Sequence, residues 1–115
     1  MDKKPNWQIG FYEDQRGRSP VLEFISGLSA KDRAKVNNVL RLLEEFGISL
    51  GMPHARQIIG KLWELRPGDN RLLYFVFEKR NIVILHGFRK RAMKTPGSEI
   101  AIAKRRMQEL LEEEK

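Results

Sequence analysis

Basic side chains crowd the segment between residues 61 and 94, and their types and spacing suit chemistry on phosphate. The segment contributes six of the seven net positive charges of the 115-residue chain. The segment holds only three carboxylates, those of Glu64, Asp69 and Glu78. Its nine basic residues are Lys61, Arg66, Arg71, Lys79, Arg80, Arg89, Lys90, Arg91 and Lys94. Such charge favours a nucleic acid as partner, although a basic surface can also serve solubility alone.

One reaction that clustered cations could promote is RNA cleavage, in which the 2′-hydroxyl attacks the neighbouring phosphorus without a metal ion. Arginine and lysine stabilise the charge that grows on the phosphoryl oxygens more than they stabilise the ground state. A lysine crowded by arginines also loses proton affinity and can then act as base or acid. The aromatic residues Trp63, Tyr74 and Phe88 could stack on a base, but in apolar strands such residues more often belong to the core.

Other kinds of catalytic site are poorly supported. The chain has no cysteine, so thiol catalysis and thiolate metal sites are excluded, and no cluster has metal-ligand spacing. His86 lies in an apolar strand and is predicted to be a half-buried residue with satisfied hydrogen bonds. His54 lies in the loop sequence GMPHAR and is either an acid–base group or a solvated loop residue. Ser19, Ser29 and Ser98 are interpreted as helix caps.

The surrounding pattern predicts the elements that must position these cations. We expect helices from Ser19 to Gly27, from Ser29 to Gly47 and from Ser98 onwards, because each begins with a capping serine and continues with an apolar stripe. Residues 47–60 are interpreted as a loop with room for a short helical turn. Strands are expected at residues 6–12, 61–66, 71–78 and 82–88, the last three joined by two short turns.

Grouped strands of this kind favour an α+β fold with an antiparallel meander. In a meander, the first and third strands end at the edge where the second begins. We therefore expect Arg66, Arg71 and residues 89–94 to converge at one end of the sheet. Neither Arg71 nor Lys90 is expected to anchor the core.

Length and composition indicate one globular domain spanning residues 1–115. Apolar residues make up 41% of the chain and charged residues 32%, which is typical of a globular protein. No apolar run approaches the ~20 residues that a membrane helix needs. Residues 1–5 lack the apolar stretch of a signal peptide, so we expect a cytoplasmic protein without a membrane partner.

Three segments follow one another at a characteristic spacing: GKLWELR (60–66), RLLYF (71–75) and IVILHGFRKRAMKTPGSEIAIAKRR (82–106). Together they resemble the RelE/ParE superfamily of toxins from bacterial type II toxin–antitoxin systems, in its HigB-like, phage-derived branch. The likeness extends from about residue 19 to residue 107. Arg91 replaces the second lysine of a basic pair in that branch and keeps its charge.

The resemblance implies a RelE-like, mainly antiparallel sheet with an N-terminal helical hairpin on one face and a C-terminal helix. It also implies ribosome-dependent cleavage of mRNA, without metal or other cofactor, by an enzyme that a helix-turn-helix antitoxin neutralises. Arg71 and Lys90 would then stabilise the transition state, while Arg66 and Arg91 would hold phosphate. Further RNA contacts would come from four residues: Lys61, Lys94, Arg89 and His54.

Two alternatives of another kind remain open. Some members of the same superfamily poison DNA gyrase by binding and hydrolyse nothing. A basic sheet could also belong to a plain RNA-binding module. Cuts confined to translated messages would distinguish the nuclease from both.

Overall fold

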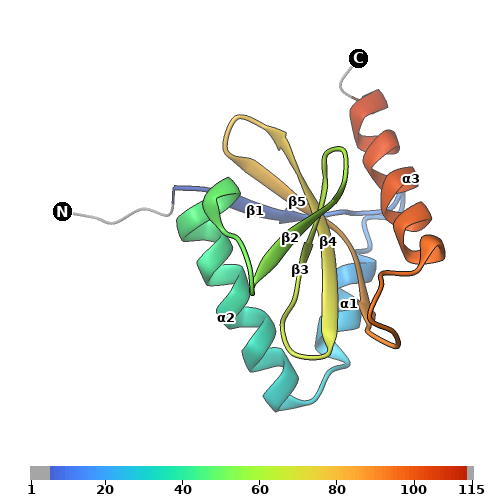
Figure 1. The fold of residues 1–115 in the computed structure, drawn as a ribbon. Coiled ribbons are helices and arrows are strands. Elements are labelled where there is room, and N and C mark those ends of the chain that lie inside the picture. The colour runs from blue at the N-terminus through green and yellow to red at the C-terminus, as the bar shows by residue number, and fades with distance from the viewer. Residues whose placement is uncertain (1–5, 114–115) are drawn as a thin grey trace.

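The computed structural model describes residues 6–113, which form a five-stranded sheet with helices on both faces (Figure 1). The helices are α1 (Pro20–Ser26), α2 (Ala30–Phe46), the 3-10 turn η1 (Gly47–Ser49) and α3 (Gly97–Glu113). The strands are β1 (Gln8–Phe11), β2 (Ala55–Ile59), β3 (Leu62–Leu65), β4 (Asn70–Glu78) and β5 (Asn81–Arg89). The predicted α+β class, the helical hairpin and the C-terminal helix are confirmed.

The sheet runs in the order β1-β5-β4-β3-β2, so β4 is the central strand. Strands β2 to β5 form an antiparallel meander, and β1 pairs with β5 in parallel. The first six residues of β4 are all buried, as expected for a strand covered on both faces. The prediction of a strand from the apolar run at residues 71–78 is therefore confirmed.

Alternate residues of β4 enter two separate cores. Leu72 and Tyr74 pack with α1 and α2, whereas Leu73 and Phe75 pack on the side of α3. Helix α3 contributes one fully buried residue, Ala103, and a border of partly buried residues. The layers are thus two helices, the sheet and one helix.

The starts of the first two helices follow the predicted capping. The Ser19 and Ser29 hydroxyls accept hydrogen bonds from the backbone N–H groups of Leu22 and Asp32, at 3.3 and 3.2 Å. Ser98 does not cap α3, because the helix already begins at Gly97 and the Pro96 carbonyl accepts its first backbone bonds. The prediction for Ser98 was wrong because Ser98 is the second residue of α3 and lies within its first turn instead of before it.

Residues 47–60 are not only a loop. The expected helical turn is η1, but the segment also contains the edge strand β2. A two-residue loop of Gly60 and Lys61 joins β2 to β3, and Gly60 has a φ of +54°, which favours glycine. The strand was missed because it is short, mixed in polarity and stabilised by pairing with β3.

Within residues 6–113, no helix combines the length and apolar character required to cross a bilayer. The expectation about a signal peptide concerns residues 1–5, which lie outside the described part of the chain. Residues 114 and 115 also lie outside the described part of the chain, whereas α3 continues through residue 113.

An arginine cluster on the α3 face of the sheet

Three arginines surround the buried carboxylate of Glu64 on the sheet face that α3 covers. The strand register explains the arrangement, since Arg56 of β2 pairs directly with Glu64 of β3. Arg66 lies two residues beyond Glu64 and therefore faces the same side. Leu65 pairs with Leu72, so the next position along sets Arg66 across from Arg71. We call Arg56, Arg66, Arg71 and Glu64 the arginine cluster.

All three guanidinium groups approach the same oxygen of Glu64, which is only 1% exposed. The distances from Nε to Oε1 are 3.2 Å for Arg56, 3.9 Å for Arg66 and 3.8 Å for Arg71. The other oxygen, Oε2, accepts a short hydrogen bond from the hydroxyl of Thr95. The buried carboxylate is thus fully paired, and the cluster keeps a local excess of two positive charges.

Arg71 is held firmly by the backbone. Its Nη1 donates hydrogen bonds to the carbonyls of Gly68, at 2.7 Å, and Asn70, at 2.8 Å. Burial, reinforced by the charge of Arg66, lowers the pKa of the Arg71 guanidinium, while Glu64 acts in the opposite direction. Arginine nevertheless stays protonated at neutral pH. Arg71 belongs to neither of the two hydrophobic cores, but its buried side chain closes the β3–β4 turn.

Arg66 is held less tightly. Its Nε is buried without a hydrogen-bond partner among the described residues, and its Nη1 contacts the sulfur of Met52 at 3.4 Å. Its side chain is 24% exposed. Arg66 therefore has donor capacity that the protein leaves unused.

The loop after β5 lies at the same end of the sheet, as the sequence predicted. The backbone N–H of Lys90 donates to the carbonyl of Asp69 in the β3–β4 turn, at 2.7 Å. Lys90 is half-buried, while Arg91 and Lys94 are exposed. These cations extend the positive charge of the arginine cluster toward solvent.

Other predicted site residues are placed differently. Arg89 forms ion pairs with Asp32 of α2, at 3.7 Å, and with Asp69, at 3.9 Å, and so turns toward the opposite face. Lys61 lies in the β2–β3 loop at the other end of the sheet. His54 has an exposed side chain, but its carbonyl accepts the backbone N–H of Arg66 at 2.9 Å. Of these three residues, Arg89 and His54 lie at the end of the sheet that holds the cluster, but the Arg89 side chain turns to the opposite face.

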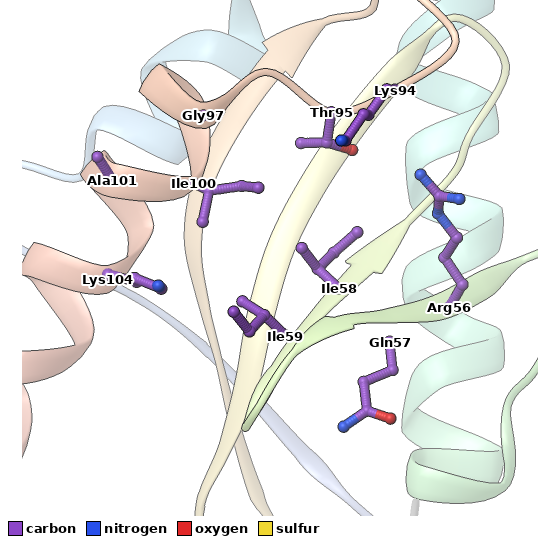
Figure 2. Close-up of a pocket in the computed structure, with 10 residues that line it drawn as sticks. All are labelled: Arg56, Gln57, Ile58, Ile59, Lys94, Thr95, Gly97, Ile100, Ala101 and Lys104. Carbon is purple, nitrogen blue, oxygen red and sulfur yellow. The ribbon is translucent and has the colours of Figure 1, made fainter.

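A groove continues from the arginine cluster between β2 and the start of α3 (Figure 2). Its volume is about 520 Å³, and the residues that the structure assigns to its walls include no carboxylate. Figure 2 shows Arg56 directed toward the loop that carries Lys94 and Thr95. The rest of the wall is mainly apolar or basic: Ile58, Ile59, Ile100, Ala101 and Lys104.

His86 is held by α3 and is not free for catalysis. Its Nε2 lies 2.9 Å from a carboxylate oxygen of Glu99, and its Nδ1 lies 3.4 Å from Nη1 of Arg106. Burial lowers the pKa of His86, although Glu99 favours the protonated ring. The predicted half-buried, hydrogen-bonded histidine is confirmed.

The aromatic residues with stacking potential belong to the core instead. Tyr74 and Phe88 are buried in the two cores, and the half-buried Trp63 packs against the core on the α1 and α2 side. The sequence analysis favoured a core position for these aromatic residues, and this prediction is confirmed. A base would therefore need a different partner for stacking.

Sequence reasoning missed three residues of this region, namely Arg56, Glu64 and Thr95. Arg56 was missed because its strand was interpreted as a loop. The hairpin itself was signalled by Gly60 and Lys61 between two apolar pairs. The pairing of Arg56 with Glu64 was not, because it depends on a β-bulge between Gln57 and Ile59 that shifts the register by one residue. Thr95 gave no signal of its own, because its contact with Glu64 depends on the path of the loop before α3.

Comparisons with known proteins agree with this architecture. The fold is that of the RelE superfamily: a crystal structure of an archaeal RelE–RelB complex from Pyrococcus horikoshii OT3 matches with a TM-score of 0.60. The two sequences are 18% identical, and the match covers 76% of this chain and 99% of the other.

The sequence itself identifies the family. The family described as "Phage derived protein Gp49-like (DUF891)" matches residues 23–108, and the chain belongs to it. No curated protein matches the sequence. The RelE-like fold and the phage-derived family expected from the motifs are therefore confirmed.

Proposed function

We propose that this protein is the toxin of a type II toxin–antitoxin system and cleaves mRNA on the ribosome. The proposal is supported by membership of a phage-derived family, by the RelE-like fold and by the arginine cluster. The observation that carries most weight is the convergence of Arg56, Arg66 and Arg71 on one sheet face with a local charge excess.

The chemistry would be attack of the 2′-oxygen on phosphorus, with departure of the 5′-oxygen and formation of a cyclic phosphate. Arg71 and Lys90 would stabilise the charge that develops on the phosphoryl oxygens, and Arg66 and Arg91 would hold the phosphate. The attacking hydroxyl must lose a proton, and the departing oxygen must gain one. His54, at the same end of the sheet, is the candidate for one of these transfers.

Partner proteins follow from the same proposal. The related archaeal RelE was crystallised in complex with RelB. We expect a helix-turn-helix antitoxin to neutralise this chain by covering its basic sheet end, which would require an acidic surface on the antitoxin. Co-expression with the neighbouring gene should then abolish toxicity and yield a co-purifying complex.

Inducible expression in bacteria tests the nuclease proposal. We expect growth arrest and new mRNA ends confined to translated messages. The double variant Lys90→Ala with Arg91→Ala should lose cutting at least tenfold. The matched control is Lys31→Ala with Arg41→Ala, which removes two exposed cations from α2 and should cut as the unmodified protein does.

Three results would contradict the proposal. Damaged DNA with intact mRNA would indicate a gyrase poison. RNA binding without toxicity would indicate an RNA-binding module. Unchanged cutting by a soluble Lys90 and Arg91 double variant would exclude this site.

A further inference from the structure

We propose that Glu64 is a positioning residue that arranges Arg56, Arg66 and Arg71 around one phosphate of the RNA. Arg56 is thereby added to the phosphate-binding arginines. The inference rests on the proposed function, because it names the residues that prepare that site for its substrate.

The geometry supports a positioning role because Glu64 uses one oxygen for all three arginines. Each guanidinium group turns its Nε toward Oε1, within 3.2 to 3.9 Å. Only the Nε of Arg56 donates a hydrogen bond to the carboxylate, whereas those of Arg66 and Arg71 approach it as ion pairs. The terminal N–H groups of Arg56 therefore remain for other partners. Arg71 spends Nη1 on two backbone carbonyls. A phosphate that meets the outward N–H groups would receive donors whose directions are already fixed.

The charges of the three arginines explain why a carboxylate, that of Glu64, lies between them. Three guanidinium groups this close would repel one another without a carboxylate between them. A carboxylate that is 1% exposed would in turn be costly to bury without such partners. The pairing leaves two charges in excess, which is what a phosphate dianion-like transition state would neutralise.

Arg56 is the arginine through which a ligand could reach the cluster. Its side chain is 37% exposed and lines the groove beside β2 (Figure 2). Thr95 lines the same groove and also bonds Glu64, so the groove wall holds one member of the cluster and the hydroxyl partner of its carboxylate. RNA that enters the groove would therefore meet Arg56 first, and through it the edge of the cluster.

Substitution of Glu64 distinguishes a role in positioning the arginines from an effect of net charge on RNA binding. Glu64→Gln raises the net charge by one, so binding of an uncleavable 2′-O-methyl oligonucleotide should be unweakened or tighter. Single-turnover cleavage on programmed ribosomes should nevertheless fall at least tenfold, because the three arginines lose the shared negative charge that holds them together. Glu64→Asp, which keeps the carboxylate, should recover part of the rate. A parallel loss of binding and cleavage, or no loss of either, would overturn the proposal.

Matched controls carry the same change in charge elsewhere. Glu78→Gln removes an exposed carboxylate at the opposite end of β4 and should keep cleavage within about twofold. Arg56→Gln should lower cleavage about tenfold and reduce the salt dependence of oligonucleotide binding by about one phosphate contact. Its control, Arg105→Gln, removes an exposed arginine of α3 and should retain normal cleavage. Equal cleavage by the Arg56 and Arg105 variants would contradict the inference.

A measurement on the unmodified protein keeps the inference separate from the nuclease proposal and from any folding defect. The ¹⁵N signals of the three arginine Nε–H groups should shift together, with one affinity, when the 2′-O-methyl oligonucleotide is added. Independent shifts, or a shift of Arg56 alone, would overturn the shared phosphate site. Concerted shifts without any cutting on ribosomes would instead leave the phosphate site standing and refute the nuclease.

Discussion

Arg56 and Glu64 stand opposite each other on β2 and β3, with Nε of the arginine 3.2 Å from the carboxylate. The pair joins an edge strand to the interior of the sheet at the point where Arg66 and Arg71 also converge. The site is therefore part of the strand pairing and is not carried by a separate loop. This relationship has consequences for both stability and activity.

Arg71→Ala should destabilise the protein by about 2 kcal/mol, because a buried ion pair and two bonds to the β3–β4 turn are lost. Arg71→Lys should lose less, since the charge remains while the planar fork of donors is lost. Urea unfolding followed by circular dichroism measures both. An alanine variant as stable as the parent would show that the turn does not depend on Arg71.

Thr95→Val should destabilise by about 1 to 2 kcal/mol, because it removes the hydroxyl that donates to the buried Oε2 of Glu64 at nearly constant volume. Ser98→Ala, an exposed change three residues later, serves as the control and should have little effect. Thermal unfolding compares the two. If both variants behave alike, the hydrogen bond contributes nothing measurable.

Acidification should weaken the protein through His86. Its pKa in the folded state is lowered by burial, so the unfolded chain binds the proton more readily below the ordinary value of about 6.5. The contribution of His86 is complete above that pH and declines as the pH falls toward the folded-state value. The free energy of unfolding at pH 7.5 and pH 5.5 should differ less in His86→Gln than in the parent. An identical difference would assign the acid sensitivity to other groups.

Gly47→Ala should be destabilising by more than about 1 kcal/mol. Gly47 has a φ of +53°, and an added Cβ would lie 2.0 Å from the ring of Trp7. Gly51→Ala is a suitable control, because nothing lies within 4 Å of a Cβ there and its φ is not positive. Chemical unfolding that ranks the two variants equally would mean that the Trp7 contact relaxes without cost.

Much of the fold could be predicted from periodicity and capping. Ser19 and Ser29 begin their helices as expected, and the apolar run after Arg71 is the central strand. Local sequence patterns did not predict the elements whose structure depends on residues distant in the sequence. Strand β2 exists through its pairing with β3, and the start of α3 depends on the Pro96 carbonyl.

The candidate site was only partly predictable for the same reason. Meander topology correctly brings Arg66, Arg71 and the loop around Lys90 to one sheet end. It could not show that Arg89 turns to the other face to meet Asp32, or that Glu64 is the buried centre of the cluster. Side-chain direction at strand ends depends on register, which one sequence specifies weakly.

The two-residue connection of Gly60 and Lys61, together with the β-bulge between Gln57 and Ile59, sets the register of β2 against β3. One added residue there would displace Arg56 by one step and turn it toward α2, because successive strand residues alternate between faces. An insertion in this small hairpin should therefore impair the cluster as much as substitution of Arg56 itself. Insertions should be better tolerated in the β4–β5 turn at Lys79 and Arg80, which holds no residue of the cluster.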